Sequence, residues 1–327
     1  LTKGTVADTF CSPENSDTLN AQRIDPPTVQ MAFSVNDSPL AGSEGDKVTG
    51  RMIGDRLMKE GEGNITLNIE KSSNDSSFLV SGRGELQLSV LIETMRREGY
   101  ELSVSKPQVL MKNDEKGNLL EPIEEVIIDV DDEYAGQVVQ DLNIRKGVML
   151  EMKPFGIGRS RLIFEAPTRG LIGYQSELLT VTSGTAVINR LFSRYESYKG
   201  EIKGRINGVL ISNGNGISVA FALFNLEERG QMIIGSGIPV YQGMIIGVHT
   251  RPNDLEVNIL KGKKLTNIRT HSKDEAVKLT PPLTMNLENA IAWISDDELI
   301  EVTPKSIRIR KKFLDPNVRK KIERKVN

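Results

Sequence analysis

The chain has 327 residues, of which 38% are hydrophobic, and its 42 Lys and Arg nearly balance 44 Asp and Glu, for a net charge of -2. This composition excludes a wholly disordered chain, and the net charge excludes a polycation that binds nucleic acid through bulk charge alone. The single cysteine, Cys11, excludes an internal disulfide and a cysteine-rich metal cluster, so a reducing, cytoplasmic location is expected.

The first predicted unit follows a polar, proline-containing stretch at residues 1–27. Strict alternation of apolar residues predicts a strand, and apolar residues at helical spacing predict helices. The predicted elements are, in order, a strand at 28–35, a helix at 48–59 closed by Gly61, strands at 65–69 and 78–80, a helix at 85–98 closed by Gly99 and a strand at 102–110. This order is typical of a ferredoxin-like βαββαβ sandwich with both helices on one face of the sheet.

The same order recurs after a predicted linker at 113–122. The elements expected there are a strand at 126–130, a helix at 134–146, strands at 148–152 and 159–164, a helix from Thr168 to Gly184 and a strand at 185–191. After about Arg194, glycines interrupt short apolar runs, which predicts a β-rich domain of short strands. We further expect a helix at 287–294 capped by Asn286, a strand at 302–309 and a basic helix beyond Pro316. The fold class is therefore α+β.

The stretch from Gln231 to Thr250 carries no formal charge, but glycines and Pro239 interrupt it. A membrane-spanning helix needs about 20 mainly apolar residues, so this stretch predicts buried strands and not a membrane span. We expect no membrane partner.

Charge is distributed unevenly along the chain. Residues 301–327 contain ten basic and three acidic residues, and residues 258–273 contain five Lys and Arg with no acid. Residues 114–133 instead contain nine acids and one base, Lys116. An isolated run of this kind is usually a solvated face, but two basic runs in one half of the chain favour a polyanionic partner. Few aromatic residues lie among these bases, with Phe313 the exception, which favours phosphate contacts over base stacking.

No catalytic motif is complete. No P-loop is present, because Gly262-Lys263-Lys264 lacks the upstream glycine and the hydroxyl residue. Of the two histidines, His249 lies in an apolar strand and His271 in the basic run, where phosphate contact is the better interpretation. The acids Asp296, Asp297 and Glu298 are interpreted as solvated charge and not as a metal site. We therefore predict no catalytic residue, no metal and no bound cofactor in this chain.

Three stretches resemble known translation factors. The segment GRGELQLSVLIETMRREGYEL at 82–102 resembles the third domain of translational GTPases of the elongation factor G class, and PTRGLIGYQSELLTVTSGTA at 167–186 resembles their domain V. Residues 207–267, together with DDELIEVTPKSIRIRKKFL at 296–314, resemble the C-terminal domain of the BipA/TypA family. The resemblance implies four parts: the end of a β-barrel domain at 1–24, a domain III-like unit at 25–112, a domain V-like unit at 113–197 and the family-specific C-terminal domain at 198–327.

The resemblance implies a ribosome-binding factor associated with large-subunit assembly and with growth under cold or other stress. The family's GTP-binding domain, where GTP and Mg²⁺ would bind, has no counterpart in these residues, so this chain is expected not to be an enzyme. Because it starts at Leu1 without a leader, we expect no signal peptide and a missing front. A monomer is expected.

The resemblance also implies two RNA-contacting groups. One corresponds by position to a loop that approaches the acceptor end of an A-site tRNA, and the other would contact ribosomal RNA. The first comprises Lys261, Lys263, Lys264, Arg269, His271 and Lys273, and the second comprises Arg308, Arg310, Lys311 and Lys312.

Two other functions stay open. The glycine-rich loop at 212–216 could cradle the phosphate of a metabolite, although Asn-Gly steps are more typical of tight hairpin turns. The acidic segment 114–133 could instead make the chain a protein-interaction scaffold.

Overall fold

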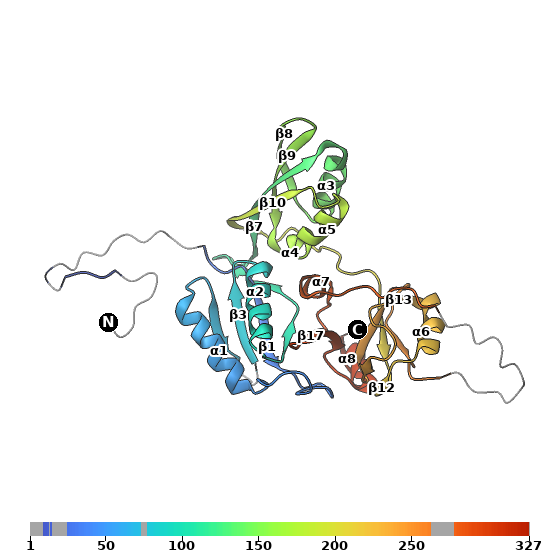
Figure 1. The fold of residues 1–327 in the computed structure, drawn as a ribbon. Coiled ribbons are helices and arrows are strands. Elements are labelled where there is room, and N and C mark those ends of the chain that lie inside the picture. The colour runs from blue at the N-terminus through green and yellow to red at the C-terminus, as the bar shows by residue number, and fades with distance from the viewer. Residues whose placement is uncertain (1–8, 13, 15–24, 73–76, 263–277, 327) are drawn as a thin grey trace, which may run out of the picture.

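The computed structural model describes residues 9–12, 14, 25–72, 77–262 and 278–326. Three parts follow one another along the chain: a first sandwich from β1 to β4, a second sandwich from β7 to β10 and a C-terminal domain from β11 to α8. Figure 1 shows the second sandwich (green) above the other two, which lie side by side. In the described part of the chain, no helix is both long and apolar enough to cross a membrane.

The first sandwich has the predicted βαββαβ order. Its elements are β1 (Val29–Val35), α1 (Gly50–Gly63), β2 (Asn68–Lys71), β3 (Ser77–Gly82), α2 (Glu85–Arg97) and β4 (Leu102–Ser105), and β5 (Gln108–Val109) pairs with β1. The strands lie in the order β4-β1-β3-β2. Helix α2 ends as predicted, with Gly99 in the left-handed region at φ 90°. Helix α1 instead runs through Gly61 to Gly63.

The second sandwich repeats this topology in a separate sheet with the order β10-β7-β9-β8. Its elements are β7 (Leu119–Asp131), α3 (Asp132–Ile144), β8 (Val148–Pro154), β9 (Arg159–Pro167), α4 (Thr168–Leu171), α5 (Tyr174–Val181) and β10 (Val187–Ser197). The predicted linker at 113–122 is wrong, because β6 (Lys112–Asn113) and β7 form a hairpin there. The predicted helix from Thr168 is two helices, since Gly173 adopts φ 75° between them.

The C-terminal domain is rich in short strands, as predicted. Its elements are β11 (Val209–Ser212), β12 (Gly216–Ile217), α6 (Ala220–Leu226), the 3-10 turn Glu227–Arg229, β13 (Gly230–Met232), β14 (Pro239–Val240), β15 (Met244–His249), β16 (Leu255–Val257), α7 (Leu287–Trp293), β17 (Glu298–Val302), β18 (Ile307–Lys311) and α8 (Pro316–Val326). Asn286 caps α7 as predicted, because its side chain accepts a hydrogen bond from Asn289 N at 2.7 Å.

Two elements of this domain differ from the sequence prediction. The apolar run at 217–224 contains helix α6 and not a single strand. The strand predicted at 302–309 is a hairpin, because Thr303 and Ser306 form its turn: Ser306 N donates to Thr303 Oγ1 at 2.8 Å. This hairpin, β17–β18, contains three of the four basic residues predicted to contact ribosomal RNA.

The C-terminal domain and the first sandwich share one sheet. Strand β17 pairs antiparallel with β4, with Ile300 opposite Val104, so one path of strands runs β16-β11-β15-β18-β17-β4-β1-β3-β2. One buried core also contains residues of both parts, including Phe33 and Ile92 from the first sandwich and Ile291 and Ile309 from the C-terminal domain. We call these two parts together the body.

Helix α7 lies where the three parts meet, beside α2 and α5. Gly173 is packed closely there: a Cβ on Gly173 would lie 2.4 Å from Cβ of Ala292. Changing Gly173 to alanine is therefore expected to lower the free energy of unfolding by about 1–3 kcal/mol, through overpacking and the positive φ. Thermal unfolding measured by circular dichroism would check this.

The matched control is Gly136→Ala in α3, where an added Cβ meets open space. This control is expected to raise stability by about 0.5–1 kcal/mol, because alanine is the better helix former. Equal melting temperatures for the two variants would contradict the packing argument.

Candidate nucleic-acid interface

Arg308 in β18 lies in a buried ionic network. Its Nε donates to Glu301 Oε2 at 2.9 Å, and its Nη1 donates to Glu44 Oε1 at 3.1 Å. Glu44 comes from the loop between β1 and α1, so this arginine joins the C-terminal domain to the first sandwich. Burial opposes ionisation of Glu44, but hydrogen bonds from Thr303, Ser306 and Arg308 lower its pKa overall.

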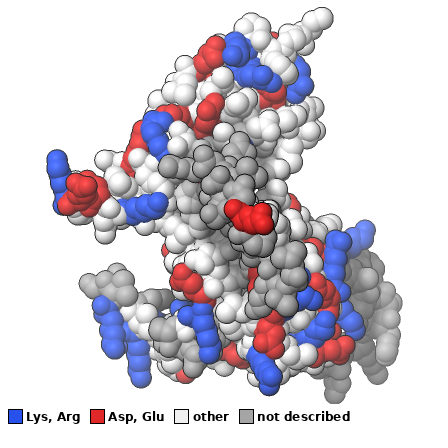
Figure 2. All heavy atoms as spheres, turned by 90° about the vertical axis from the view of Figure 1, so that its left-hand side faces the viewer, with Lys and Arg blue, Asp and Glu red and all other residues white. Residues whose placement is uncertain are grey.

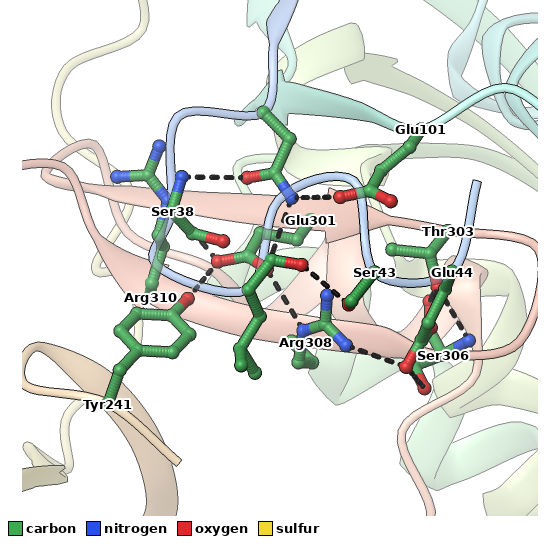
Figure 3. Close-up of polar contacts among 12 residues, drawn as sticks. Ser38, Ser43, Glu44, Glu101, Tyr241, Glu301, Thr303, Ser306, Arg308 and Arg310 are labelled. Carbon is green, nitrogen blue, oxygen red and sulfur yellow. Dashed lines mark hydrogen bonds and ion pairs between the residues drawn. The ribbon is translucent and has the colours of Figure 1, made fainter. Parts of the chain in front are cut away.

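Arg310 lies on the other side of Glu301. Its guanidinium pairs with Asp37 and lies with Nε 3.5 Å from Glu301 Oε1, and Tyr241 also donates to Glu301. Figure 3 shows these side chains pointing toward Glu301. Glu301 has no exposed surface, and burial raises the pKa of its carboxyl group although both arginines oppose this shift. The carboxylate therefore depends on the two guanidinium groups for its charge.

Lys311 is held by three carboxylates. Its Nζ lies 2.6 Å from Asp254 Oδ2, 2.7 Å from Asp297 Oδ2 and 3.1 Å from Glu298 Oε1. Glu298 also pairs with Arg205 at 2.7 Å. The interpretation of the acids 296–298 as solvated charge therefore holds for the exposed Asp296 and Asp297 and is wrong for the buried Glu298.

The predicted RNA contacts of β18 need correction for three residues. Arg308, Arg310 and Lys311 are 7%, 2% and 2% exposed, and each pairs with carboxylates. A side chain that is buried and neutralised by acidic neighbours offers little charge to a phosphate. Only Lys312 of this group is exposed. Arg308 and Arg310 therefore join the C-terminal domain to the first sandwich, through Glu44 and Asp37. Lys311 instead holds acids within the C-terminal domain.

Of the loop predicted to approach tRNA, the structure describes only Lys261, which is exposed. Lys263, Lys264, Arg269, His271 and Lys273 lie outside the described residues. The other histidine, His249, is buried, with Nδ1 2.6 Å from the Asn253 carbonyl oxygen. This agrees with its interpretation as part of an apolar strand.

The exposed bases of α8 belong to the basic run at 301–327 but are not among the individually predicted RNA contacts. Lys320, Lys321, Arg324 and Lys325 are exposed on this helix. Arg319 fixes the start of α8, because it donates to the Leu314 carbonyl oxygen at 2.7 Å and pairs with Glu256. The helix thus presents several cations on a scaffold that is held to the domain. The charge of residues 301–327 pointed to this region, but only the structure separates its buried bases from its exposed ones.

One face of the molecule shows mixed charges. On the face drawn in Figure 2, which includes the α1 side of the first sandwich, basic (blue) and acidic (red) groups are interspersed among uncharged residues. Interspersed charges of this kind give a weak field for a polyanion. The described bases of α8 are therefore a better candidate for contact with phosphates than this face is.

Only part of the acidic segment 114–133 is open to solvent. Three of its acids are buried on β7 and pair with arginines of the same sandwich. The pairs are Glu121 with Arg169, Glu124 with Arg190 and Asp129 with Arg161. These acids therefore have structural partners, and the geometry does not favour a scaffold that captures partners through this segment.

The glycine-rich loop at 212–216 is also occupied by contacts of its own. Ser212 Oγ donates to the Gly214 carbonyl oxygen at 3.0 Å, and Asn215 Oδ1 accepts from Gln242 N at 2.8 Å. The expected tight hairpin is wrong, since β12 pairs with β14 and not with β11. Within the described residues, no group of three His, Cys, Asp or Glu side chains is placed to hold a metal.

Known proteins match the chain over nearly its whole length. The family model of the elongation factor G C-terminus matches residues 118–206, and that of the TypA/BipA C-terminal domain matches residues 207–316. The protein named large ribosomal subunit assembly factor BipA from Salmonella typhimurium is 52% identical over 320 residues, which cover 98% of this chain and 53% of that protein. Residues 207–316 are thus similar to the C-terminal domain of the TypA/BipA family.

A second relative matches over the same extent. The Haemophilus influenzae protein of the same name is 52% identical over 98% of this chain and 52% of its own length, so the chain spans about half the length of the curated relatives it matches. A crystal structure of a Thermus thermophilus protein aligns with TM-score 0.36 at 17% identity, over 55% of this chain and 42% of that one. That similarity is too low to carry an argument.

The TypA/BipA match contains the whole β17–β18 hairpin and ends at Pro316, where α8 begins. Glu301, Arg308 and Arg310 thus lie within the matched domain, whereas their partners Glu44 and Asp37 lie outside it. Helix α8 follows the end of the match.

Proposed function

We propose that this chain forms the C-terminal, RNA-contacting part of a factor in assembly of the large ribosomal subunit. The observation that carries the proposal is the 52% identity, over 98% of the chain, to proteins named large ribosomal subunit assembly factor BipA. In the proposal the partner is ribosomal RNA, and the finer roles implied by the family are contact with the acceptor end of an A-site tRNA and a role in translation under cold or other stress.

The geometry supports α8 and Lys312 as the ribosomal RNA contacts. A chain with a net charge of -2 needs a local concentration of cations to bind a polyanion. The exposed bases of α8 provide one, and the long flexible side chains of lysine suit phosphates. Lys261 and its five basic neighbours up to Lys273 remain the proposed tRNA contacts.

The proposal assigns no catalytic step and no cofactor to residues 1–327. Both matched family models describe C-terminal domains. In the proposal, GTP and Mg²⁺ belong to a domain that resembles no part of this chain, and the factor acts as a monomer in the cytoplasm, where ribosomes are.

Co-sedimentation with purified large and small ribosomal subunits tests the proposal. We expect saturable binding to the large subunit that weakens as salt increases, because contacts with phosphates release counterions. Binding that is equal for the two subunits, or that does not respond to salt, would contradict the proposal. The chain carrying Lys312→Ala and Lys261→Ala is expected to bind more weakly than the unchanged protein.

A further inference from the structure

The second sandwich and the body have separate sheets and separate cores. The five strands of the second sandwich form a sheet of their own, and its buried core, which includes Val126, Phe164 and Leu178, contains only residues of this sandwich. The body, by contrast, has a continuous sheet and a common core across its two parts. Parts that share neither a sheet nor a core can move relative to each other unless specific contacts hold them.

Glu85 makes those specific contacts. It is the first residue of α2 in the body, and its Oε2 accepts a hydrogen bond from Gly173 N of the second sandwich at 2.8 Å. Its Oε1 lies 3.3 Å from Nη1 of Arg190 on β10. Among the described residues, the hydrogen bonds between the second sandwich and the body both end on Glu85.

Contacts within the second sandwich position the Arg190 side chain for its pair with Glu85. Its Nε donates to Glu124 Oε2 at 2.8 Å, and its Nη1 also donates to the Leu171 carbonyl oxygen at 3.2 Å. The side chains of Arg190, Glu85 and Glu124 are 18%, 15% and 6% exposed. A charge pair removed from water in this way is weakly screened, and loss of one partner leaves the other charge buried without compensation.

We infer that Arg190 is an interdomain latch, which fixes the orientation of the second sandwich on the body by pairing with Glu85. Burial raises the pKa of Glu85, and Arg190 opposes this shift, so the carboxylate at the start of α2 depends on the arginine for its charge. Around the latch, α4 lies beside β5 and α5 beside α7. These contacts keep the second sandwich next to the body. The pair of Arg190 and Glu85 then fixes one of the orientations that these contacts permit.

The inference goes beyond RNA binding and is tested on the free protein. Spin labels would be placed on Lys59→Cys in α1 and Glu133→Cys in α3, both exposed, in a chain with Cys11→Ser. Pulsed electron paramagnetic resonance then gives the distribution of distances between the two spin labels, one on the body and one on the second sandwich. We expect one narrow distribution for the parent protein, and a broader distribution with an additional population after Arg190→Ala.

The control is Arg194→Ala on the same strand. Arg194 pairs with Glu165 and Glu196, which belong to the second sandwich itself, so its loss removes an arginine from β10 without cutting a contact with the body. The distance distribution of this control is expected to match that of the parent. Glu85→Gln keeps the acceptor for Gly173 N but removes the charge, so it is expected to broaden the distribution less than Arg190→Ala.

Two results would overturn the latch. One is an unchanged distance distribution in Arg190→Ala, and the other is equal broadening in Arg190→Ala and Arg194→Ala. If Arg190→Ala does not fold, Glu85→Gln alone decides: a distribution that is identical to that of the parent contradicts the inference, and a broader one supports it. Neither distance measurement depends on ribosome binding, so failure of the latch and failure of the proposed function are distinguishable.

Discussion

Replacing Arg308 by alanine is expected to lower the free energy of unfolding by about 3–5 kcal/mol, because removing one partner of a buried ion pair leaves the other uncompensated. Glu301 would lose its contact with Arg308 Nε, which lies 2.9 Å from Glu301 Oε2. Glu44 would lose its contact with Arg308 Nη1, which lies 3.1 Å from Glu44 Oε1. Urea unfolding followed by tryptophan fluorescence measures this effect, since the single tryptophan, Trp293, lies at the end of α7 and packs against the core of the body.

The control for this prediction is Lys312→Ala, further along the chain at an exposed position. Its effect on stability is expected to stay within about 0.5 kcal/mol, as is usual for surface substitutions. Similar urea midpoints for Arg308→Ala and Lys312→Ala would show that the network around Glu301 does not hold the body together.

The second large effect is expected on RNA binding. Changing Lys320, Lys321, Arg324 and Lys325 to glutamate should weaken binding to large subunits by about a hundredfold or more at low salt, and should lower the slope of log affinity against log salt by roughly three to four. The reason is that each phosphate contact contributes nearly one released counterion. A filter-binding or co-sedimentation titration at several salt concentrations measures both quantities.

The matched control reverses four exposed bases elsewhere, Arg51, Lys59, Lys116 and Lys153, which changes the net charge by the same amount. This control is expected to keep most of the affinity and the original salt slope, because a local contact is lost only in the α8 variant. If the two variants lose affinity equally, bulk charge and not α8 determines binding.

The topology of both sandwiches could be predicted because their signals are local. Alternation in β1 and helical spacing in α2 depend on neighbouring residues, and the structure shows both. The same holds for the cap at Asn286 in the C-terminal domain. Helix α6 was missed because an unbroken apolar run has no period, so a buried helix and a buried strand give the same pattern. The turn at Thr303–Ser306 was missed within a run that otherwise looks like one strand.

The buried bases of β18 could have been found from the sequence once the hairpin was known. In the register of that hairpin, Glu301 lies opposite Arg308 and Glu298 opposite Lys311, so opposite charges face each other about a common turn. Other contacts could not be found in this way. They are the pairing of β17 with β4, the contact of Arg308 with Glu44, and the pairs of Arg190 with Glu85 and Glu124. They join residues far apart in the chain, and no local pattern specifies such a contact.

The central claim is that RNA is contacted by the exposed bases of the C-terminal region and not by the buried bases of β18. Ultraviolet cross-linking of the chain to large subunits, followed by mass spectrometry, tests this most directly. The account predicts RNA-linked peptides from 312–325 and from the region of Lys261, with none attached within 307–311. RNA-linked peptides within 307–311, or only within the two sandwiches, would contradict it.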